Sequence, residues 1–175
     1  SARAFEHFAK GGLYDAQNDL LNAIKEYLAA ASYDSTSSDI YVALARDYYQ
    51  LGQRQDAIRY AEKAVILDDE AFEAHLVLGK CYRDLRLFQQ SRTAFERVVE
   101  LDPSEVEAHF SIMQIAERQN DDAVVLRELE ILGRLVPRSA DVHFRLAEAY
   151  KKQSQIDKAI IEYQKVIDDF PTSVR

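Results

Sequence analysis

The amino-acid sequence repeats the same residue types at intervals of 34 residues, and this period restricts the folds that the chain can adopt. A period of this length is typical of repeat proteins, in which one unit cannot bury its apolar face alone and stacks on its neighbours. Two series show this most clearly. One consists of small or branched residues: Ala23, Ala57, Ser91, Val125 and Ala159. The other has tyrosine in four copies of five: Tyr14, Tyr48, Tyr82, Ala116 and Tyr150.

Five copies of the unit account for all but five of the 175 residues. This leaves no room for a second kind of domain, so we predict one repeat domain over residues 1–175. The copies span residues 4–37, 38–71, 72–105, 106–139 and 140–173.

Each copy carries two stretches with a helical period. In the second copy, Tyr41, Leu44, Ala45 and Tyr48 recur at i, i+3, i+4 and i+7, which is one apolar stripe of a helix. Gly52 follows as a helix-ending residue, and a second stripe begins at residue 57. The pattern predicts ten helices over residues 4–17, 20–33, 38–51, 54–67, 72–85, 88–101, 106–119, 122–136, 140–153 and 156–169.

The recurring residues resemble the tetratricopeptide repeat. The pattern of that repeat is defined at positions 4, 7, 8, 11, 20, 24, 27 and 32. In the third copy these positions hold His75, Leu78, Gly79, Tyr82, Ser91, Phe95, Val98 and Pro103. In the fifth copy they hold His143, Leu146, Ala147, Tyr150, Ala159, Tyr163, Val166 and Pro171. The resemblance implies an all-α fold, a right-handed superhelix of ten antiparallel helices. It also implies a function in protein–protein interaction.

The fourth copy departs from the pattern. It has Met113 at position 8, Val125 at position 20 and Ala116 at position 11. Small residues at positions 8 and 20 let the two helices of a copy cross closely, because interaxial distance depends on the side chains at the contact. We therefore expect the helices of the fourth copy to lie further apart or to cross differently, with a local bend in the superhelix.

Composition excludes several classes of function. A net charge of −8 disfavours a nucleic-acid partner, which requires a basic face. No apolar run approaches the ~18 residues of a membrane span, so we expect a soluble protein, whose compartment the sequence does not indicate. The single cysteine, Cys81, excludes an internal disulfide framework.

No catalytic or metal-binding arrangement emerges from the sequence. His7, His75, His109 and His143 all occupy position 4, where Tyr41 stands in the second copy. Equivalent side chains of stacked helices ~8–10 Å apart do not converge on one ion, so we interpret these histidines as packing residues. Cys81 is interpreted as a semi-buried helix residue. We therefore predict no enzyme activity, no metal and no cofactor.

The surface of the first helices carries the candidate binding site. In the family that the chain resembles, positions 5, 9 and 12 typically face a concave groove. Position 5 is apolar in every copy, and cations gather at positions 9 and 12 of the middle copies. The predicted groove residues are Phe8, Val42, Arg46, Tyr49, Leu76, Lys80, Arg83, Phe110, Gln114 and Phe144.

Two interpretations of these cations remain open. An apolar strip beside Arg46, Lys80 and Arg83 suits a peptide or protein partner with acidic and large apolar residues. Alternatively, the cations pair with Asp47, Asp84 and Glu73 on the surface. The carboxylate clamp by which some family members hold chaperone tails is not expected, because its positions hold Phe8, Gly12, Ala43, Glu73 and Val77.

The last predicted helix presents Ile160, Tyr163, Val166 and Ile167 with little sequence beyond it. Solenoids need end units with a polar outer face. We therefore expect that the natural protein continues or that this uncapped helix packs on another chain, which includes self-association. The predicted function is a protein-binding scaffold or adaptor. The alternatives are a regulatory or substrate-recruiting segment of a larger enzyme and a self-assembling structural array.

Overall fold

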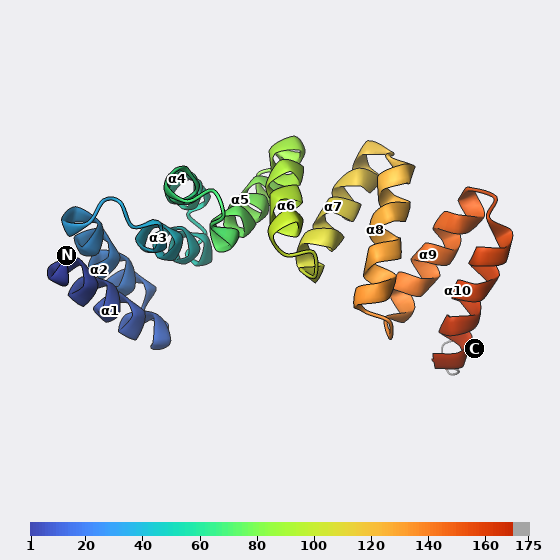
Figure 1. Cartoon of the computed structure of the whole chain (residues 1–175), viewed down its shortest axis with the longest axis horizontal. Coiled ribbons are helices and arrows are strands. Elements are labelled where there is room, and N and C mark those ends of the chain that lie inside the picture. Colours follow the sequence, from blue (N-terminus) through green and yellow to red (C-terminus); the bar gives the residue numbers. More distant parts are fainter. Residues whose placement is uncertain (170–175) are drawn as a thin grey trace. The chain divides into compact units, whose positions relative to one another are not determined.

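The structure is a computed structural model that describes residues 1–169, and this part of the chain is all α-helical (Figure 1). The predicted boundaries agree with the observed ones to within two residues. Pro171 and Arg175 lie outside the described residues. The helices are α1 (Ala2–Ala16), α2 (Leu20–Tyr33), α3 (Ser38–Gln50), α4 (Arg54–Leu67), α5 (Phe72–Asp84), α6 (Phe88–Leu101), α7 (Val106–Gln119), α8 (Asp122–Leu135), α9 (Ala140–Lys152) and α10 (Ile156–Asp169).

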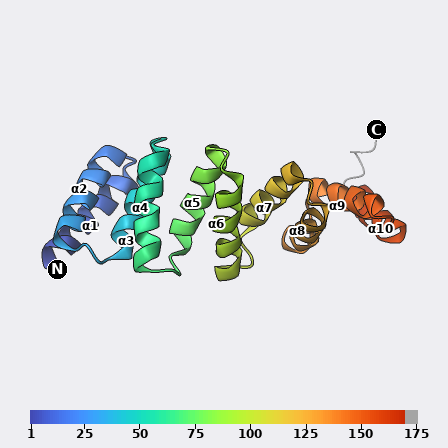
Figure 2. The same ribbon diagram turned by 90° about the horizontal axis from the view of Figure 1, so that it is seen from above.

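Each 34-residue copy forms one helical hairpin, and consecutive helices pack against each other within α1–α6 and within α7–α10 (Figures 1 and 2). The chain divides into two compact units after Leu101. Unit 1 contains α1–α6 and unit 2 contains α7–α10. No described helix is long and apolar enough to cross a membrane.

The core of unit 1 depends on small residues where the helices of a hairpin cross. Ala23, Ala57 and Ser91, all at position 20, are completely buried. Ser91 Oγ donates a hydrogen bond of 2.8 Å to the carbonyl oxygen of Gly79, the residue at position 8 of the same copy. This contact between positions 8 and 20 is the close crossing that the sequence pattern predicts.

The core of unit 2 contains larger residues at its first crossing. Met113 is completely buried and packs in one cluster with Leu129 and Leu132. The helices α7 and α8 make a smaller contact with each other than the two helices of any other hairpin. This smaller contact agrees with the expectation for the fourth copy, in which larger side chains stand at positions 8 and 20.

The turn between the two helices of every hairpin contains one residue in the left-handed region. Only one of the five is glycine, and the period of the turn is again 34 residues. The residues and their φ angles are Asn18 (58°), Gly52 (79°), Arg86 (61°), Asn120 (56°) and Ser154 (60°). Asparagine tolerates this conformation better than most residues, whereas a longer side chain is strained in it.

Replacing Arg86 with glycine is expected to stabilise unit 1 by ~0.5–1 kcal/mol, because glycine removes the steric cost of a positive φ. Arg86 is exposed, so little packing is lost. The reverse change, Gly52→Ala, is expected to destabilise the unit by ~1 kcal/mol. No atom lies within 4 Å of the added Cβ at position 52, so only backbone strain is tested there. Urea unfolding curves of the two variants measure both values, and a loss of stability in Arg86→Gly would contradict the argument.

Candidate functional site

The predicted groove residues all lie on the first helices of their hairpins. Seven of them belong to unit 1 and three to unit 2, and each unit is therefore described separately. Those of unit 1 are Phe8 on α1, Val42, Arg46 and Tyr49 on α3, and Leu76, Lys80 and Arg83 on α5; those of unit 2 are Phe110 and Gln114 on α7 and Phe144 on α9.

The apolar groove residues of unit 1 contribute to the core as well as to the surface. Phe8, Val42 and Tyr49 are partly buried and pack against the core cluster. The Phe8 ring lies 5.4 Å from the Tyr27 ring in a tilted arrangement. Leu76 is also half-buried. The strip at position 5 of unit 1 therefore offers only part of each side chain to a partner.

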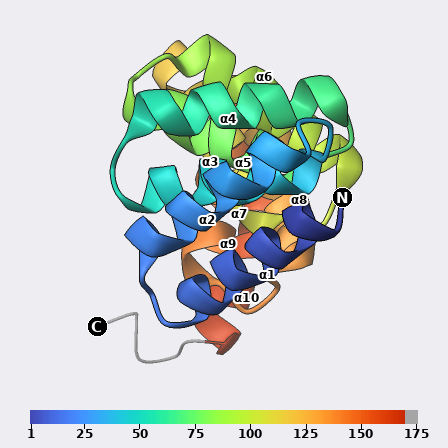
Figure 3. The ribbon, with the colours of Figure 1, turned by 90° about the vertical axis from the view of Figure 1, so that its left-hand side faces the viewer.

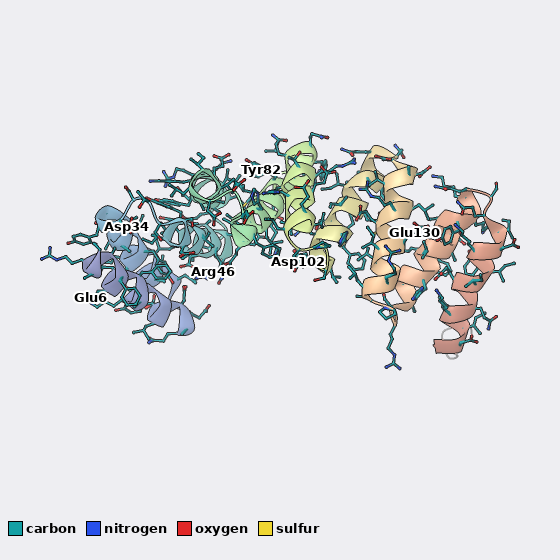
Figure 4. The ribbon with its side chains drawn as sticks, in the orientation of Figure 1. Glu6, Asp34, Arg46, Tyr82, Asp102 and Glu130 are labelled. Atoms are coloured by element: carbon teal, nitrogen blue, oxygen red, sulfur yellow. The ribbon has the colours of Figure 1, made fainter. Side chains whose placement is uncertain are left out.

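Arg46, labelled in Figure 4, is held between two aspartates. Its Nη2 donates to Asp15 of α1, and its Nε donates to Asp47 at 3.2 Å. The hydroxyl of Tyr27 donates to Asp15 as well, at 2.7 Å. One oxygen of Asp15 and one of Asp47 are buried without a hydrogen-bond partner among the described residues.

Burial is the main reason why the pKa of Asp47 lies above its ordinary value, and repulsion by Asp15 adds to the shift. Asp47 is completely buried, and Arg46 pairs with both carboxyl groups. The positive charge of Arg46 is therefore compensated inside the protein. Reversing this charge would leave two aspartates without their counter-ion, so Arg46 is a structural residue as well as a candidate for binding.

The other cations of the middle copies also have partners. Arg54 lies 4.2 Å from the centre of the Tyr49 ring and bonds to Asp84 at 2.6 Å. The Arg83 guanidinium lies 5.6 Å from the centre of the Phe95 ring. Of the ion pairs considered from the sequence, that of Arg46 with Asp47 is present. Asp84 pairs with Arg54, which the sequence argument did not consider.

A cavity of about 700 Å³ opens in unit 2 beside α9. Its apolar side is formed by Val125 and Leu129 of α8 together with Phe144 and Ala149 of α9. Leu129 is nearly completely buried, whereas half of the Phe144 surface is exposed. The Phe144 ring meets the Tyr163 ring edge-on at 5.8 Å. Phe144 thus stands beside a cavity large enough for a side chain of a partner, and Phe8 lines a smaller cavity of about 340 Å³ in unit 1.

The rim of this cavity carries three ion pairs of balanced charge. Arg145 pairs with Glu117, Lys152 bonds to Asp122 at 2.6 Å, and Lys151 bonds to Glu148 at 3.3 Å. Hydrogen bonds from Tyr163 and then Lys151 hold the pKa of Glu148 below its ordinary value. Exposed pairs of this kind contribute little to stability, so a partner can exchange them for its own contacts.

Cys81 and Asp121 have structural roles. Burial raises the pKa of Cys81 to about 11, which leaves its thiol protonated and unreactive. Cys81 is completely buried rather than semi-buried. The Asp121 side chain accepts a hydrogen bond from the backbone N–H of Val124 and so caps α8. Within residues 1–169 no group of three or more His, Cys, Asp or Glu side chains comes together to hold a metal ion.

The histidines at position 4 do more than fill space. The Nδ1 atoms of His7, His109 and His143 lie 2.6–2.7 Å from glutamate oxygens of the second helix of the same hairpin. The Nε2 atoms of His75, His109 and His143 lie 2.9–3.0 Å from carbonyl oxygens of the preceding loop. Each of these histidines therefore links a helix to the loop or to its partner helix.

Models of the tetratricopeptide repeat match residues 42–105, 82–124 and 141–173. These segments cover more than half of the chain, and the chain belongs to the tetratricopeptide repeat family. No curated protein matches its sequence.

Solved structures share the fold at low identity. The MamA protein is 19% identical with a TM-score of 0.80, over 95% of this chain and 91% of that chain. YrrB, reported as a TPR protein with an unusual peptide-binding site, is 22% identical with a TM-score of 0.79, over 97% and 87%. MamA 41-end from Desulfovibrio magneticus RS-1 is 14% identical with a TM-score of 0.79, over 100% and 99%. These neighbours support a tetratricopeptide solenoid.

Proposed function

We propose that the chain is a protein-binding scaffold whose first helices receive a peptide or protein partner. The observation that carries this proposal is Phe144, a large ring with half its surface exposed beside a cavity of about 700 Å³. Burying an exposed aromatic ring against a partner is a strong source of binding energy. The family and the fold support an interaction role in general.

The partner favoured by this site presents apolar side chains to the cavity. The rim is neutral, since each of its cations is paired with a carboxylate. In unit 1, Arg46 is likewise compensated by Asp15 and Asp47. The expected partner therefore binds mainly through its apolar side chains and less through acidic ones.

Replacing Phe144 with serine is expected to weaken binding of selected peptides by ~30-fold, the loss typical of an interface hot spot. A random peptide library selected on the wild-type protein supplies the ligands, and fluorescence anisotropy measures their affinities. Ile66→Ser is the control, because Ile66 is 83% exposed on α4 of unit 1 and outside the cavity. Peptides that bind Phe144→Ser and wild type equally would exclude the cavity as the binding site.

A second candidate function is self-association through α10, and the exposed face of this helix favours it. Ile156, Ile160 and Ile167 are each about half exposed and lie at i, i+4 and i+11, on one stripe of the helix. A second copy of the chain would cover this stripe. Such a contact is compatible with binding at the α9 cavity.

If the chain self-associates, the sedimentation coefficient of the wild type is expected to rise with protein concentration. In the variant that carries both Ile160→Lys and Ile167→Lys, it is expected to stay constant. A lysine on the stripe places a charge in the contact, which costs several kcal/mol if it is buried unpaired. Ile66→Lys serves as the control for added charge. A wild-type protein that sediments as a monomer at all concentrations would exclude this function.

A further inference from the structure

A histidine–glutamate pair recurs within the hairpins. His7, His109 and His143 stand at position 4, and their Nδ1 atoms lie 2.7, 2.7 and 2.6 Å from the glutamate at position 23 of the same copy. The second copy replaces the pair with Tyr41 and Tyr60, whose rings stack 6.4 Å apart. Position 23 is thus filled by a large side chain in four copies.

The third copy has the histidine without the glutamate. Ala94 occupies position 23, and His75 faces it from position 4. His75 Nε2 lies 2.9 Å from the carbonyl oxygen of Asp69 and must donate to it. Among the described residues no group hydrogen-bonds to His75 Nδ1, although the residue is only 9% exposed.

A cavity of about 460 Å³ occupies the place of the missing side chain. Its walls come from α5 and α6, which are labelled in Figure 3, and Tyr82 of α5, one of its lining residues, is labelled in Figure 4. The corresponding cavity of the fifth copy, where Glu162 is present, measures about 280 Å³. The larger cavity is lined mainly by apolar surface, with His75, Leu78, Tyr82, Thr93, Ala94 and Arg97 among its residues.

A cation stands beside this cavity at the position that contacts the carboxylate in the fifth copy. In the fifth copy, Glu162 accepts a hydrogen bond of 2.7 Å from Lys165 in addition to its contact with His143. Arg97 stands in the third copy where Lys165 stands in the fifth. Arg97 Nη2 lies 3.7 Å from Asp69 Oδ2, and Arg97 Nη1 lies 3.0 Å from Glu100 Oε2. The Arg97 side chain is about one-third exposed, so its guanidinium group can turn toward a ligand.

We propose that this cavity binds a glutamate side chain presented by a partner protein. The carboxylate would lie between His75 Nδ1 and Arg97, as Glu162 lies between His143 and Lys165. The methylene groups would pack on Leu78 and Tyr82. Because Nε2–H donates to Asp69, a hydrogen bond from Nδ1 to the carboxylate requires the doubly protonated ring. This site is separate from the α9 cavity and does not rest on the proposed function.

The test uses the α-amide of N-acetylglutamate as the probe and the nuclear magnetic resonance signals of the His75 ring as the readout. A ligand of this size is expected to bind with a dissociation constant in the ~1–10 mM range. The α-amide of N-acetylglutamine is the matched neutral probe, and it should bind ~10-fold more weakly because it lacks the charge-assisted bonds.

Two variants complete the test. Ala94→Glu supplies the missing carboxylate from the chain itself, so it should remove the response of His75 to the probe. Arg97→Gln keeps the cavity and should weaken binding severalfold, and it covers the case in which Ala94→Glu fails to fold. A response that is equal for both probes, one that persists in folded Ala94→Glu, or no response at saturating probe would each overturn the proposal.

Discussion

Replacing Glu128 with leucine is expected to destabilise unit 2 by about 3 kcal/mol, because it breaks a buried charged pair. Glu128 Oε2 lies 2.7 Å from His109 Nδ1, and Arg127 bonds to Oε1 at 2.8 Å. Both His109 and Glu128 are almost completely buried. Leucine fills the space but leaves His109 Nδ1 without its partner. His109 can lose its proton, which keeps the loss at the lower end of the range for broken buried pairs.

The cost of this change is expected to depend on pH. The hydrogen bond to Glu128 raises the pKa of His109, so the stability that the histidine contributes is present below its ordinary pKa and is lost as pH rises through the raised value. Burial opposes ionisation of Glu128, but its bonds to His109 and Arg127 outweigh burial and lower its pKa. The glutamate contribution is therefore lost as pH falls through that lowered value. The effect of Glu128→Leu should be largest between about pH 4.5 and 6.5 and smaller at pH 9.

Native-state hydrogen exchange of the α7 and α8 amides measures this loss within unit 2, where a single global unfolding transition need not apply. The control is Glu26→Leu, which removes the same kind of pair from a more exposed place. His7 and Glu26 are 28% and 20% exposed, so their pair should contribute less than ~1 kcal/mol. Equal losses in the two variants, or a loss independent of pH, would contradict the role of burial.

Replacing Gly11 with alanine is expected to destabilise unit 1 by about 2 kcal/mol, because the methyl group overlaps the Tyr27 ring. An ideal Cβ at residue 11 would lie 2.4 Å from Cε1 of Tyr27. The ring cannot easily retreat, since it is buried, packs against Phe8 and bonds to Asp15 through its hydroxyl. Helix α1 must therefore move away from α2 or the tyrosine must leave its rotamer.

The neighbouring glycine provides the matched control. A Cβ at Gly12 would approach nothing closer than the Tyr27 hydroxyl at 4.0 Å, and Gly12 is exposed in the same helix. Gly12→Ala should therefore stabilise unit 1 by ~0.5–1 kcal/mol through helix propensity alone. Chemical denaturation of both variants gives the two values. Changes of the same sign at residues 11 and 12 would show that the close approach to Tyr27 does not decide stability.

The sequence alone predicted the fold well because the 34-residue period constrains packing and helix length together. Each helix boundary follows from the apolar stripe and its turn, and the structure places all ten within two residues of the prediction. The packing role of the histidines and the close crossing at positions 8 and 20 also followed from the period. Gly79 with Ser91 illustrates this, since a small residue at one position meets a small residue at the other.

The candidate site was predicted less completely because its properties depend on residues that do not repeat. Arg46 is compensated by Asp15, which lies 31 residues earlier in the chain. Reading positions 5, 9 and 12 separately could not reveal that contact. The cavity beside Phe144 depends on the geometry of α8 and α9, and only Phe144 among the predicted groove residues lines it.

The cavity at His75 could have been inferred from the sequence. Position 23 holds Glu26, Tyr60, Ala94, Glu128 and Glu162 in successive copies, and alanine is the smallest of these side chains. The signal was Ala94, which interrupts a series of larger side chains at position 23, a position that is not part of the tetratricopeptide pattern. Once the pairing of positions 4 and 23 is known, this single residue marks where the hairpin is incomplete.

The left-handed turn residues indicate that the fold can be more stable than this sequence makes it. Arg86 and Ser154 adopt a conformation that favours glycine, and they lie in different hairpins of different units. Effects at such distant positions add, so glycine at both would be worth ~1–2 kcal/mol in total. Natural sequences commonly keep such reserves, because selection acts only on stability that function requires. Glycine at these two turns would therefore give a more stable variant in which the residues that line the α9 cavity and the His75 cavity are unchanged.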